Sequence, residues 1–193
     1  MTGKIKNFDG LNILLGVSGG ISAYKAVDLA SSLTSAGACV KTIMTESACH
    51  LVGPKSFEAV TSQEVYTSLW SGCEEYKISH VNLVDWADIV AVVPATADII
   101  GKAANGICDD LLSTVLCVCW KKPTLFAPAM NNNMWENPAV QKNVERIREM
   151  GFELIGPEKG RLACGKDAIG RMAEPQDILE AIFAIASKGK SKK

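Results

Sequence analysis

The sequence predicts an α/β fold in which a parallel β-sheet carries helices on both faces. Short apolar runs typical of strands alternate along the chain with helical patterns, as in successive βαβ units. One of these runs, Asp88–Val93, is apolar at nearly every position, as expected for a strand covered on both faces. At 193 residues, 48% of them hydrophobic, the chain has the size and composition of one domain with a substantial core.

The expected elements alternate over most of the chain. The strands are Leu11–Val17, Cys39–Met44, the short Val65–Leu69, Asp88–Val93, Pro123–Ala127 and Glu153–Ile155. The helices are Ile21–Ala36, the short Ser56–Thr61, His80–Trp86, Ala97–Ala104, Asp110–Trp120, Ala139–Met150 and a last one from Pro175 to about Ser187. Pro94 is expected to end its strand. Residues 156–175 fit no element and predict a functional or disordered loop, and residues 188–193 predict a disordered basic tail.

Composition excludes several classes of protein. The net charge of −1 gives no basic field for nucleic acid. No apolar run approaches the ~18 residues of a membrane span, and residues 1–10 lack the apolar centre of a signal peptide, so we expect a cytoplasmic protein. The seven cysteines are odd in number and form no Cys-x-x-Cys, which argues against a disulfide framework or a zinc site.

The first strand leads into a glycine-rich turn that suits a phosphate group. Backbone N–H groups of the turn Gly16–Ser22 can converge there, beside the positive end of the following helix. The turn matches neither an NTPase loop nor Gly-x-Gly-x-x-Gly, so a mononucleotide fits better than a dinucleotide. Thr45 follows the second strand and would supply a hydroxyl at the same edge of the sheet. A plain tight turn and a plain helix N-cap are the alternatives for these two segments.

Two further segments place polar groups at this edge. Pro94, Thr96 and Asp98 follow the most apolar strand and can surround a planar ligand ring, or can simply begin a helix. Residues 131–133 are three asparagines between a strand and a helix. An amide there can hold a carboxylate, although asparagine also favours turns.

Two candidates for proton transfer lie elsewhere in the chain. His80 is suited to general-base catalysis near neutral pH, although a lone histidine can equally be structural, as we expect for His50. Cys164 lies among glycines and cations in the irregular stretch, where a protonated thiol can act as an acid. Arg161, Lys166 and Arg171 offer anion contacts there on charge alone. A mobile surface loop with an incidental thiol is the alternative.

The order and spacing of these motifs resemble those of the flavin-dependent cysteine decarboxylases over roughly residues 10–187. The shared motifs are Gly16–Ser22, Ser79–His80, Pro94–Asp98, Pro128–Trp135 and Leu162–Gly165. The resemblance implies a single FMN-binding decarboxylase domain over residues 1–193, with a flavodoxin-like, Rossmann-type sheet and residues 156–175 as a clamp over the substrate. It also implies a homotrimer, or a dodecamer of trimers, with sites at contacts between copies. The chain is either a stand-alone enzyme or a domain excised from a decarboxylase–synthase fusion.

The resemblance also implies roles for individual residues. His80 is the expected base, Asn131 the group that holds the substrate carboxylate, and Cys164 the final proton donor. The expected cofactor contacts are Gly16, Ser18, Gly19, Gly20 and Thr45 at the FMN phosphate, and Pro94, Thr96 and Asp98 near the flavin. The expected substrate contacts are Asn131, Met134, Ala163, Gly165 and Lys166. Many relatives have asparagine at the position of Asp98, so the flavin contact of this carboxylate is a weaker expectation.

The implied reaction is the decarboxylation of 4'-phosphopantothenoylcysteine to 4'-phosphopantetheine in coenzyme A biosynthesis. Hydride transfer to FMN gives a thioaldehyde, which serves as the electron sink for loss of CO2 and leaves an enethiolate. Alternatives are a peptidyl-cysteine oxidative decarboxylase, which would not need Cys164, a non-catalytic FMN-binding regulatory protein, and a flavin prenyltransferase of similar fold.

Overall fold

The central element is a six-stranded parallel sheet, which confirms the predicted α/β fold. The computed structural model describes residues 7–70 and 79–190. The strands of the sheet are β1 (Asn12–Val17), β2 (Cys39–Met44), β3 (Val65–Tyr66), β4 (Ile89–Ala95), β5 (Thr124–Pro128) and β6 (Glu153–Leu154). They are ordered β3-β2-β1-β4-β5-β6, and every neighbouring pair is parallel. This order is that of a Rossmann-type sheet.

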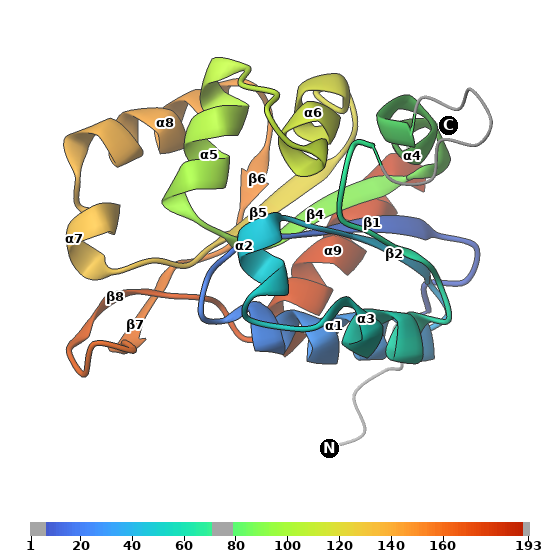
Figure 1. Ribbon diagram of the computed structural model, residues 1–193, viewed down its shortest axis with the longest axis horizontal. Helices are drawn as coiled ribbons and strands as arrows, with labels where there is room; N and C mark the ends of the chain where they lie inside the picture. The colour runs from blue at the N-terminus through green and yellow to red at the C-terminus, as the bar shows by residue number, and fades with distance from the viewer. Residues whose placement is uncertain (1–6, 71–78, 191–193) are drawn as a thin grey trace.

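Helices cover both faces of the sheet (Figure 1). One layer contains α1 (Ala23–Ser35), α3 (Pro54–Thr61) and α9 (Pro175–Lys190). The other contains α4 (Ser79–Trp86), α5 (Ala97–Asn105), α6 (Leu111–Val118) and α8 (Pro138–Glu149). Two short helices, α2 (Glu46–Cys49) and α7 (Asn132–Trp135), directly follow the turns after β2 and β5. No helix in the described part of the chain is long and apolar enough to cross a membrane.

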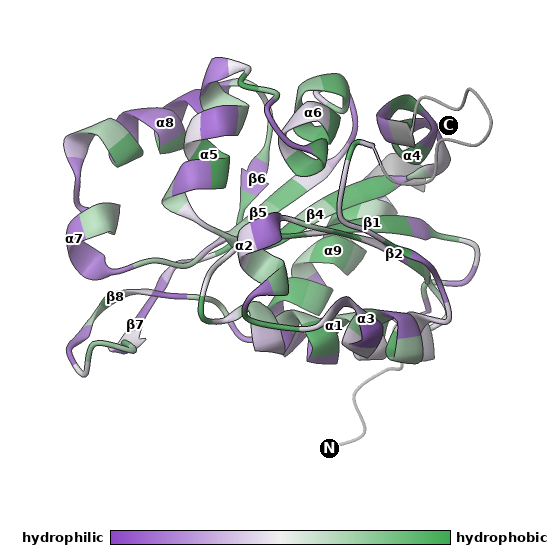
Figure 2. Ribbon diagram, in the orientation of Figure 1, coloured by the Kyte–Doolittle hydropathy of each residue, from purple (hydrophilic) through white to green (hydrophobic). Residues whose placement is uncertain are grey.

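Each face of the sheet has its own hydrophobic core. Leu29 and Leu33 of α1 and Ile178 and Ile182 of α9 are fully buried on one face. On the other, the buried side chains of α5, α6 and α8 pack together. Strand β4 is buried at all seven positions because both layers cover it. Figure 2 shows this pattern, with hydrophobic central strands and helices whose outer faces are more polar.

Several element boundaries differ from the prediction, and three of these differences matter for the site or the chain end. Residues 156–175 contain an antiparallel hairpin of β7 (Glu158–Arg161) and β8 (Asp167–Arg171), so this stretch is not structureless. Strand β4 continues through Pro94 to Ala95, because a register shift against β5 accommodates the missing N–H. Helix α9 extends to Lys190, which lies within the predicted disordered tail, and residues 191–193 lie outside the described part.

The strand order creates a crevice between β1 and β4. These neighbours lead to helices on opposite faces, α1 after β1 and α5 after β4. The two connections therefore diverge at the carboxyl ends of the strands, where open α/β sheets bind their ligands. The turn after β1 and the start of α5 lie at this edge, and the β5–α7 connection follows the next strand along.

Candidate functional site

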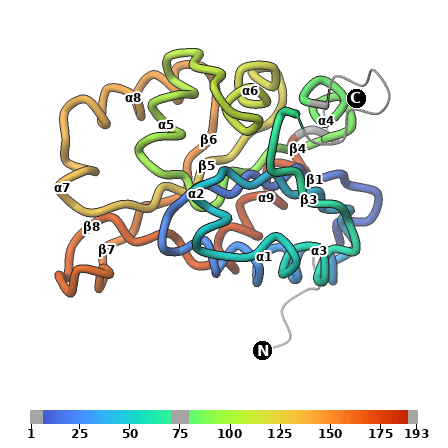
Figure 3. Tube along the Cα trace, in the orientation of Figure 1, coloured from blue at the N-terminus to red at the C-terminus, as the bar shows by residue number. Residues whose placement is uncertain are grey.

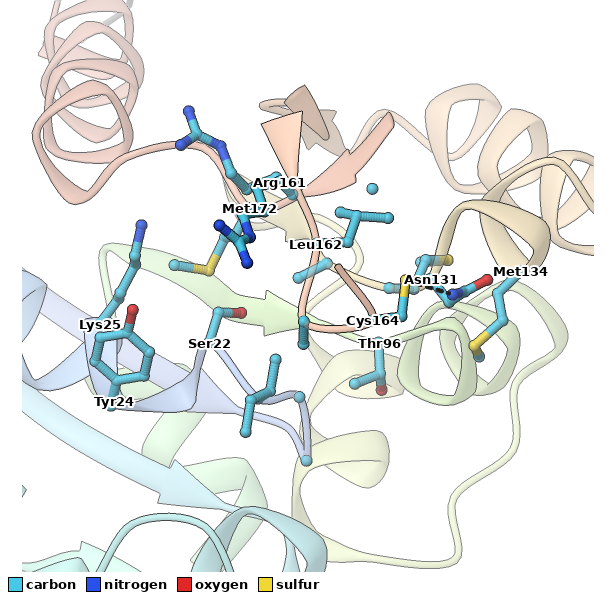
Figure 4. Close-up of a pocket in the computed structure, with 18 residues that line it drawn as sticks. Ser22, Tyr24, Lys25, Thr96, Asn131, Met134, Arg161, Leu162, Cys164 and Met172 are labelled. Atoms are coloured by element: carbon cyan, nitrogen blue, oxygen red, sulfur yellow. Dashed lines mark hydrogen bonds between the residues drawn. The ribbon is translucent and has the colours of Figure 1, made fainter. Parts of the chain in front are cut away.

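A cavity of about 800 Å³ opens at this crevice (Figure 4). Its walls come from the turn between β1 and α1, the start of α5, the segment after β5 and the β7–β8 hairpin. Of the residues predicted for the site, Gly19, Gly20, Thr96, Asn131, Met134, Ala163 and Cys164 line it. A volume of this size accommodates a cofactor or a drug-sized ligand.

The turn after β1 offers an anion-binding wall. A Cβ on Gly19 would lie 2.3 Å from the Cβ of Ser47, so only glycine permits this close approach of the turn to α2. Ser22, the N-cap of α1, makes no side-chain capping bond. Its Oγ is buried, has no hydrogen-bond partner in the described structure, and belongs to a residue that lines the cavity. A buried hydroxyl at a helix N-terminus is suited to a phosphate oxygen.

Three residues predicted for the phosphate have local structural contacts and do not line the cavity. The Oγ of buried Ser18 donates to the Pro94 carbonyl at 2.7 Å and accepts from the Thr96 N–H at 3.1 Å, which ties β1 to β4. A Cβ on Gly16 would lie 2.5 Å from Leu112 Cδ1. The Thr45 hydroxyl caps α2 by accepting from the Ala48 N–H at 3.2 Å. Their roles toward FMN stay predictions.

Of the three residues predicted to contact the flavin near the start of α5, only one lines the cavity. Thr96 lines the cavity and caps α5 by accepting from the Ile99 N–H, whereas Pro94 and Asp98 do not line it. The Asp98 carboxylate is exposed and pairs with Lys102 at 3.2 Å. Burial lowers the pKa of Lys102, but its hydrogen bonds to Asp109, Asp98 and Asp110 outweigh this effect and raise that pKa. Asp98 therefore belongs to an ion cluster beside the cavity.

The structure brings Asn131 and Cys164 together. Asn131 is the N-cap of α7, and its Oδ1 accepts from the Asn133 N–H at 2.9 Å. Its Nδ2 donates to Cys164 Sγ at 3.6 Å, the contact drawn as a dashed line in Figure 4. Asn132 and Asn133 are the first two residues of α7. The amide and the thiol thus share one corner of the cavity.

A backbone contact holds the hairpin over this corner. The Met130 N–H donates to the Gly170 carbonyl at 3.0 Å. Gly170 has φ of +138°, and a Cβ there would lie 2.2 Å from the Met130 carbonyl oxygen, so glycine is required. The hairpin thereby places Ala163 and Cys164 in the wall. Gly165 and Lys166, also predicted as substrate contacts, are exposed and do not line the cavity.

Three basic residues also line the cavity, namely Lys25, Arg161 and Arg171. Lys25 pairs with Glu174 at 2.8 Å, and Arg171 pairs with Glu158 at 2.8 Å and with Glu174 at 3.4 Å. Sequence reasoning included Ile21 and Ser22 in the Gly16–Ser22 motif without a role for either, and it missed Tyr24 and Lys25 in the wall. Tyr24 and Lys25 lie in the first turn of α1, directly after the glycine-rich turn, and this position was the signal that could have identified them.

His80 does not join the other predicted residues. It is half-buried on α4, a helix that contacts α6 and β1, and it does not line the cavity. Figures 1 and 3 show α4 and the β7–β8 hairpin at opposite ends of the molecule. Within the described residues no group of histidine, cysteine and carboxylate side chains could hold a metal ion.

The chain is similar to several known proteins. A model of the flavoprotein family matches residues 4–187. The bifunctional coenzyme A biosynthesis protein CoaBC of Bacillus subtilis is 48% identical over 169 residues, which cover 88% of this chain and 41% of that protein. The chain therefore spans about two fifths of the length of this relative.

Two solved structures share the fold over most of their length. A phosphopantothenoylcysteine (PPC) decarboxylase mutant in complex with pantothenoylaminoethenethiol superposes with a TM-score of 0.83 at 33% identity, covering 92% of this chain and 98% of that one. The FMN-dependent cysteine decarboxylase SpaF gives a TM-score of 0.78 at 34% identity, with the same coverage.

Proposed function

We propose, from the premise that this chain belongs to the flavoprotein family, that it decarboxylates 4'-phosphopantothenoylcysteine to 4'-phosphopantetheine with FMN as cofactor. The reaction is a step of coenzyme A biosynthesis. The observation that carries the proposal is the contact between Asn131 and Cys164, because it joins a carboxylate-binding amide and a proton-donating thiol in one cavity. The likeness to CoaBC and to the PPC decarboxylase complex supports this choice of substrate.

The residues of the cavity fit FMN. Ser22 and the backbone of Gly19 and Gly20 would hold its phosphate, since the Ser22 hydroxyl is buried and unpartnered in the described structure and a helix N-terminus favours an anion. Thr96 would lie near the isoalloxazine ring. When bound, FMN supplies the acceptor for a hydride from the cysteine Cβ, which makes the carboxylate a leaving group.

Asn131 and Cys164 then act on the substrate. The Asn131 Nδ2 can donate to the substrate carboxylate and fix its orientation, which is an effect of positioning. The Cys164 thiol lies 3.6 Å from that nitrogen, so its proton can reach the carbon from which CO2 has left. The hairpin that bears Cys164 would also exclude water from this corner.

We propose that His80 serves the site of a neighbouring copy in a homotrimer. The separation of α4 from the hairpin supports this arrangement, because the helix that bears His80 lies at the opposite end of the molecule and His80 does not line the cavity of its own chain. In that position His80 would remove the thiol proton when the substrate is oxidised.

A peptidyl-cysteine oxidative decarboxylase is the second candidate, because the likeness to SpaF, an FMN-dependent cysteine decarboxylase, supports the cofactor and the reacting cysteine in both candidates alike. Such an enzyme releases an oxidised enethiol and has no use for a proton donor at Cys164. The position of Cys164 beside Asn131 therefore favours the redox-neutral reaction with the small-molecule substrate.

The test is the mass of the product. Purified protein should be yellow, and wild type should convert phosphopantothenoylcysteine to the substrate minus CO2. Cys164→Ser should also release CO2 but give a product two hydrogens lighter, with the flavin left reduced. Cys117→Ser, which alters an exposed thiol of α6 outside the cavity, is the matched control and should behave as wild type. Release of only the enethiol by wild type would favour the second candidate.

A further inference from the structure

The cations of the cavity wall differ in how far their charge is neutralised. Lys25, Arg161 and Arg171 all line the cavity. Figure 4 shows Arg161 and Leu162 of the hairpin on one side and Tyr24, Lys25 and Ser22 of the α1 side opposite. The substrate of the proposed reaction carries a phosphate, so one of these cations is expected to recognise it.

Lys25 and Arg171 are engaged with carboxylates. The Lys25 Nζ lies 3.0 and 2.8 Å from the two oxygens of Glu174. Arg171 uses one nitrogen on Glu158 at 2.8 Å and another on Glu174 at 3.4 Å. Two cations face two carboxylates in this chain of contacts, so its net charge is zero. A phosphate placed beside it would be attracted less than by an unpaired cation, because each carboxylate offsets part of the attraction.

Arg161 makes no ion pair or hydrogen bond of its side chain within residues 7–70 and 79–190. It is exposed at the end of β7 and lines the cavity. Lys159 and Lys166 of the same hairpin are also exposed, but neither lines the cavity. Among the cations of the wall, Arg161 is thus the one whose charge and five N–H donors are available to a ligand.

The position of Arg161 also matches the length of the substrate. The Leu162 N–H donates to the Lys166 carbonyl at 2.8 Å, and the Gly165 N–H to the Leu162 carbonyl at 2.9 Å, so Arg161 and Cys164 belong to one closed turn. Their Cα atoms are at most about 11 Å apart. The pantothenoyl arm between the cysteine carboxylate and the phosphate has roughly the length of four extended residues, about 13 Å. With the cysteine end at Asn131 and Cys164, the guanidinium of Arg161 lies within reach of the phosphate.

We propose that Arg161 binds the phosphate of the substrate and selects phosphopantothenoylcysteine over its dephosphorylated form. The role rests on the proposed function for its substrate. The other two cations of the wall belong to an ion-pair network that holds the hairpin, formed by Lys25, Glu174, Arg171 and Glu158. Arg161 is outside this network, so its charge is available to the ligand. Arg161 is thereby a specificity residue, distinct from the group that holds the carboxylate.

The test compares phosphorylated and dephosphorylated ligands on the FMN-loaded protein. Arg161→Gln should raise the KM for phosphopantothenoylcysteine roughly tenfold or more at little change in kcat, since a hydrogen bond to a charged group is lost. The KM for pantothenoylcysteine should stay within about twofold of wild type, and Arg161→Lys should recover part of the preference as a point charge. Lys159→Gln is the matched control on the same strand and should alter neither KM.

Binding without turnover separates this proposal from the proposed function. Calorimetric titration of wild type and Arg161→Gln with 4'-phosphopantothenate and with pantothenate gives the phosphate preference directly. One outcome is that wild type turns over neither substrate and still binds 4'-phosphopantothenate more tightly than pantothenate. If Arg161→Gln then removes this preference, the proposed reaction is wrong, but Arg161 is still the residue that binds the phosphate. If Arg161→Gln keeps the preference, weakens both ligands equally or loses FMN, Arg161 does not bind the substrate phosphate.

Discussion

At the scale of single residues, Gly170 shows how one backbone position controls the site. Its positive φ and its carbonyl contact with Met130 seat the hairpin beside Asn131. Any side chain there would meet the Met130 carbonyl, so the hairpin would have to move away. The distance between Asn131 and Cys164 depends on this seat.

Gly170→Ala should therefore impair activity more than stability. We expect a loss of at least tenfold in kcat/KM, because displacement of a catalytic group by about 1 Å can cost that much. The free energy of unfolding should fall by about 1–3 kcal/mol, as for other strained backbone positions. Gly151→Ala is the control, since Gly151 also has positive φ but has open space around its Cα. Denaturant unfolding and steady-state kinetics on both variants decide the point, and equal loss of activity in both would contradict it.

The candidate site could be predicted in part at this scale. Asn131 and Cys164 were predictable because their residue types follow motifs with a defined spacing, and the structure brings them together. Ser22 was not, because the sequence does not reveal that Ser18 is bonded to Pro94 while the hydroxyl of Ser22 has no partner in the described structure. Hydrogen-bond partners across 76 residues depend on the strand order, which the local sequence does not specify.

At the scale of elements, an ion-pair network connects the hairpin to α1 and to the turn before α9. Lys25 lies on α1, Glu174 just before α9, and Arg171 at the end of β8. The hydrogen bond from Lys25 lowers the pKa of Glu174 below its usual 4.5, and burial only partly opposes this effect. These contacts restrain the end of β8 where it returns to the main domain.

Glu174→Gln should make the β7–β8 hairpin open more often than in wild type, and this difference should depend on pH. Because the folded pKa is lowered, the carboxylate stabilises the closed hairpin above about pH 4.5, and this contribution is lost as the pH falls through the folded pKa. The pairs are partly exposed, so we expect about 1 kcal/mol or less. Hydrogen exchange of hairpin amides at pH 6 should be faster in the variant than in wild type, with the difference shrinking near pH 3. Glu58→Gln, whose partner is Lys55 on α3, is the control. A difference that is the same at both pH values would contradict the role of this charge.

The elements of the main sheet were predictable, and the hairpin was not. Strand β4 is apolar throughout and α1 has a helical apolar stripe, so both patterns follow from burial. Strands β7 and β8 are half exposed and rich in charge and glycine, so their sequence shows neither the two-residue apolar repeat of a strand nor the 3.6-residue repeat of a helix. Their pairing depends on each other and on the contact of Gly170 with Met130.

At the scale of the whole molecule, the separation of His80 from the cavity predicts shared sites. If each site takes its histidine from one copy and its thiol from another, two inactive variants can complement each other. His80→Asn should stop turnover while FMN stays bound, and Cys164→Ser should stop before pantetheine.

Co-expression of these two variants with different tags gives mixed oligomers. In a closed trimer that contains both variants, one of the three sites has both native residues, so about a third of wild-type activity per flavin should return. The measurement is pantetheine formed per flavin in doubly tagged oligomers. Homo-oligomers of each variant are the controls, and normal turnover by the His80→Asn homo-oligomer would show that His80 has no role. If both homo-oligomers are inactive, absence of activity in the mixture would show that the histidine and the thiol act within one chain.

The cavity takes residues from both ends of the chain, from Gly19 after the first strand to Met172 before the last helix. During synthesis, the glycine-rich turn after β1 and the other walls of the cavity leave the ribosome before the hairpin. Met134, the last residue of the wall before the hairpin, precedes Met172 by 38 residues, so at 5–20 residues per second the interval is roughly 2 to 8 seconds. A nascent chain can thus fold the part of the cavity that binds the cofactor before Cys164 has been synthesised, so FMN can bind before the proposed proton donor is in place. Folding of the last forty residues would then close the site over a flavin that is already bound.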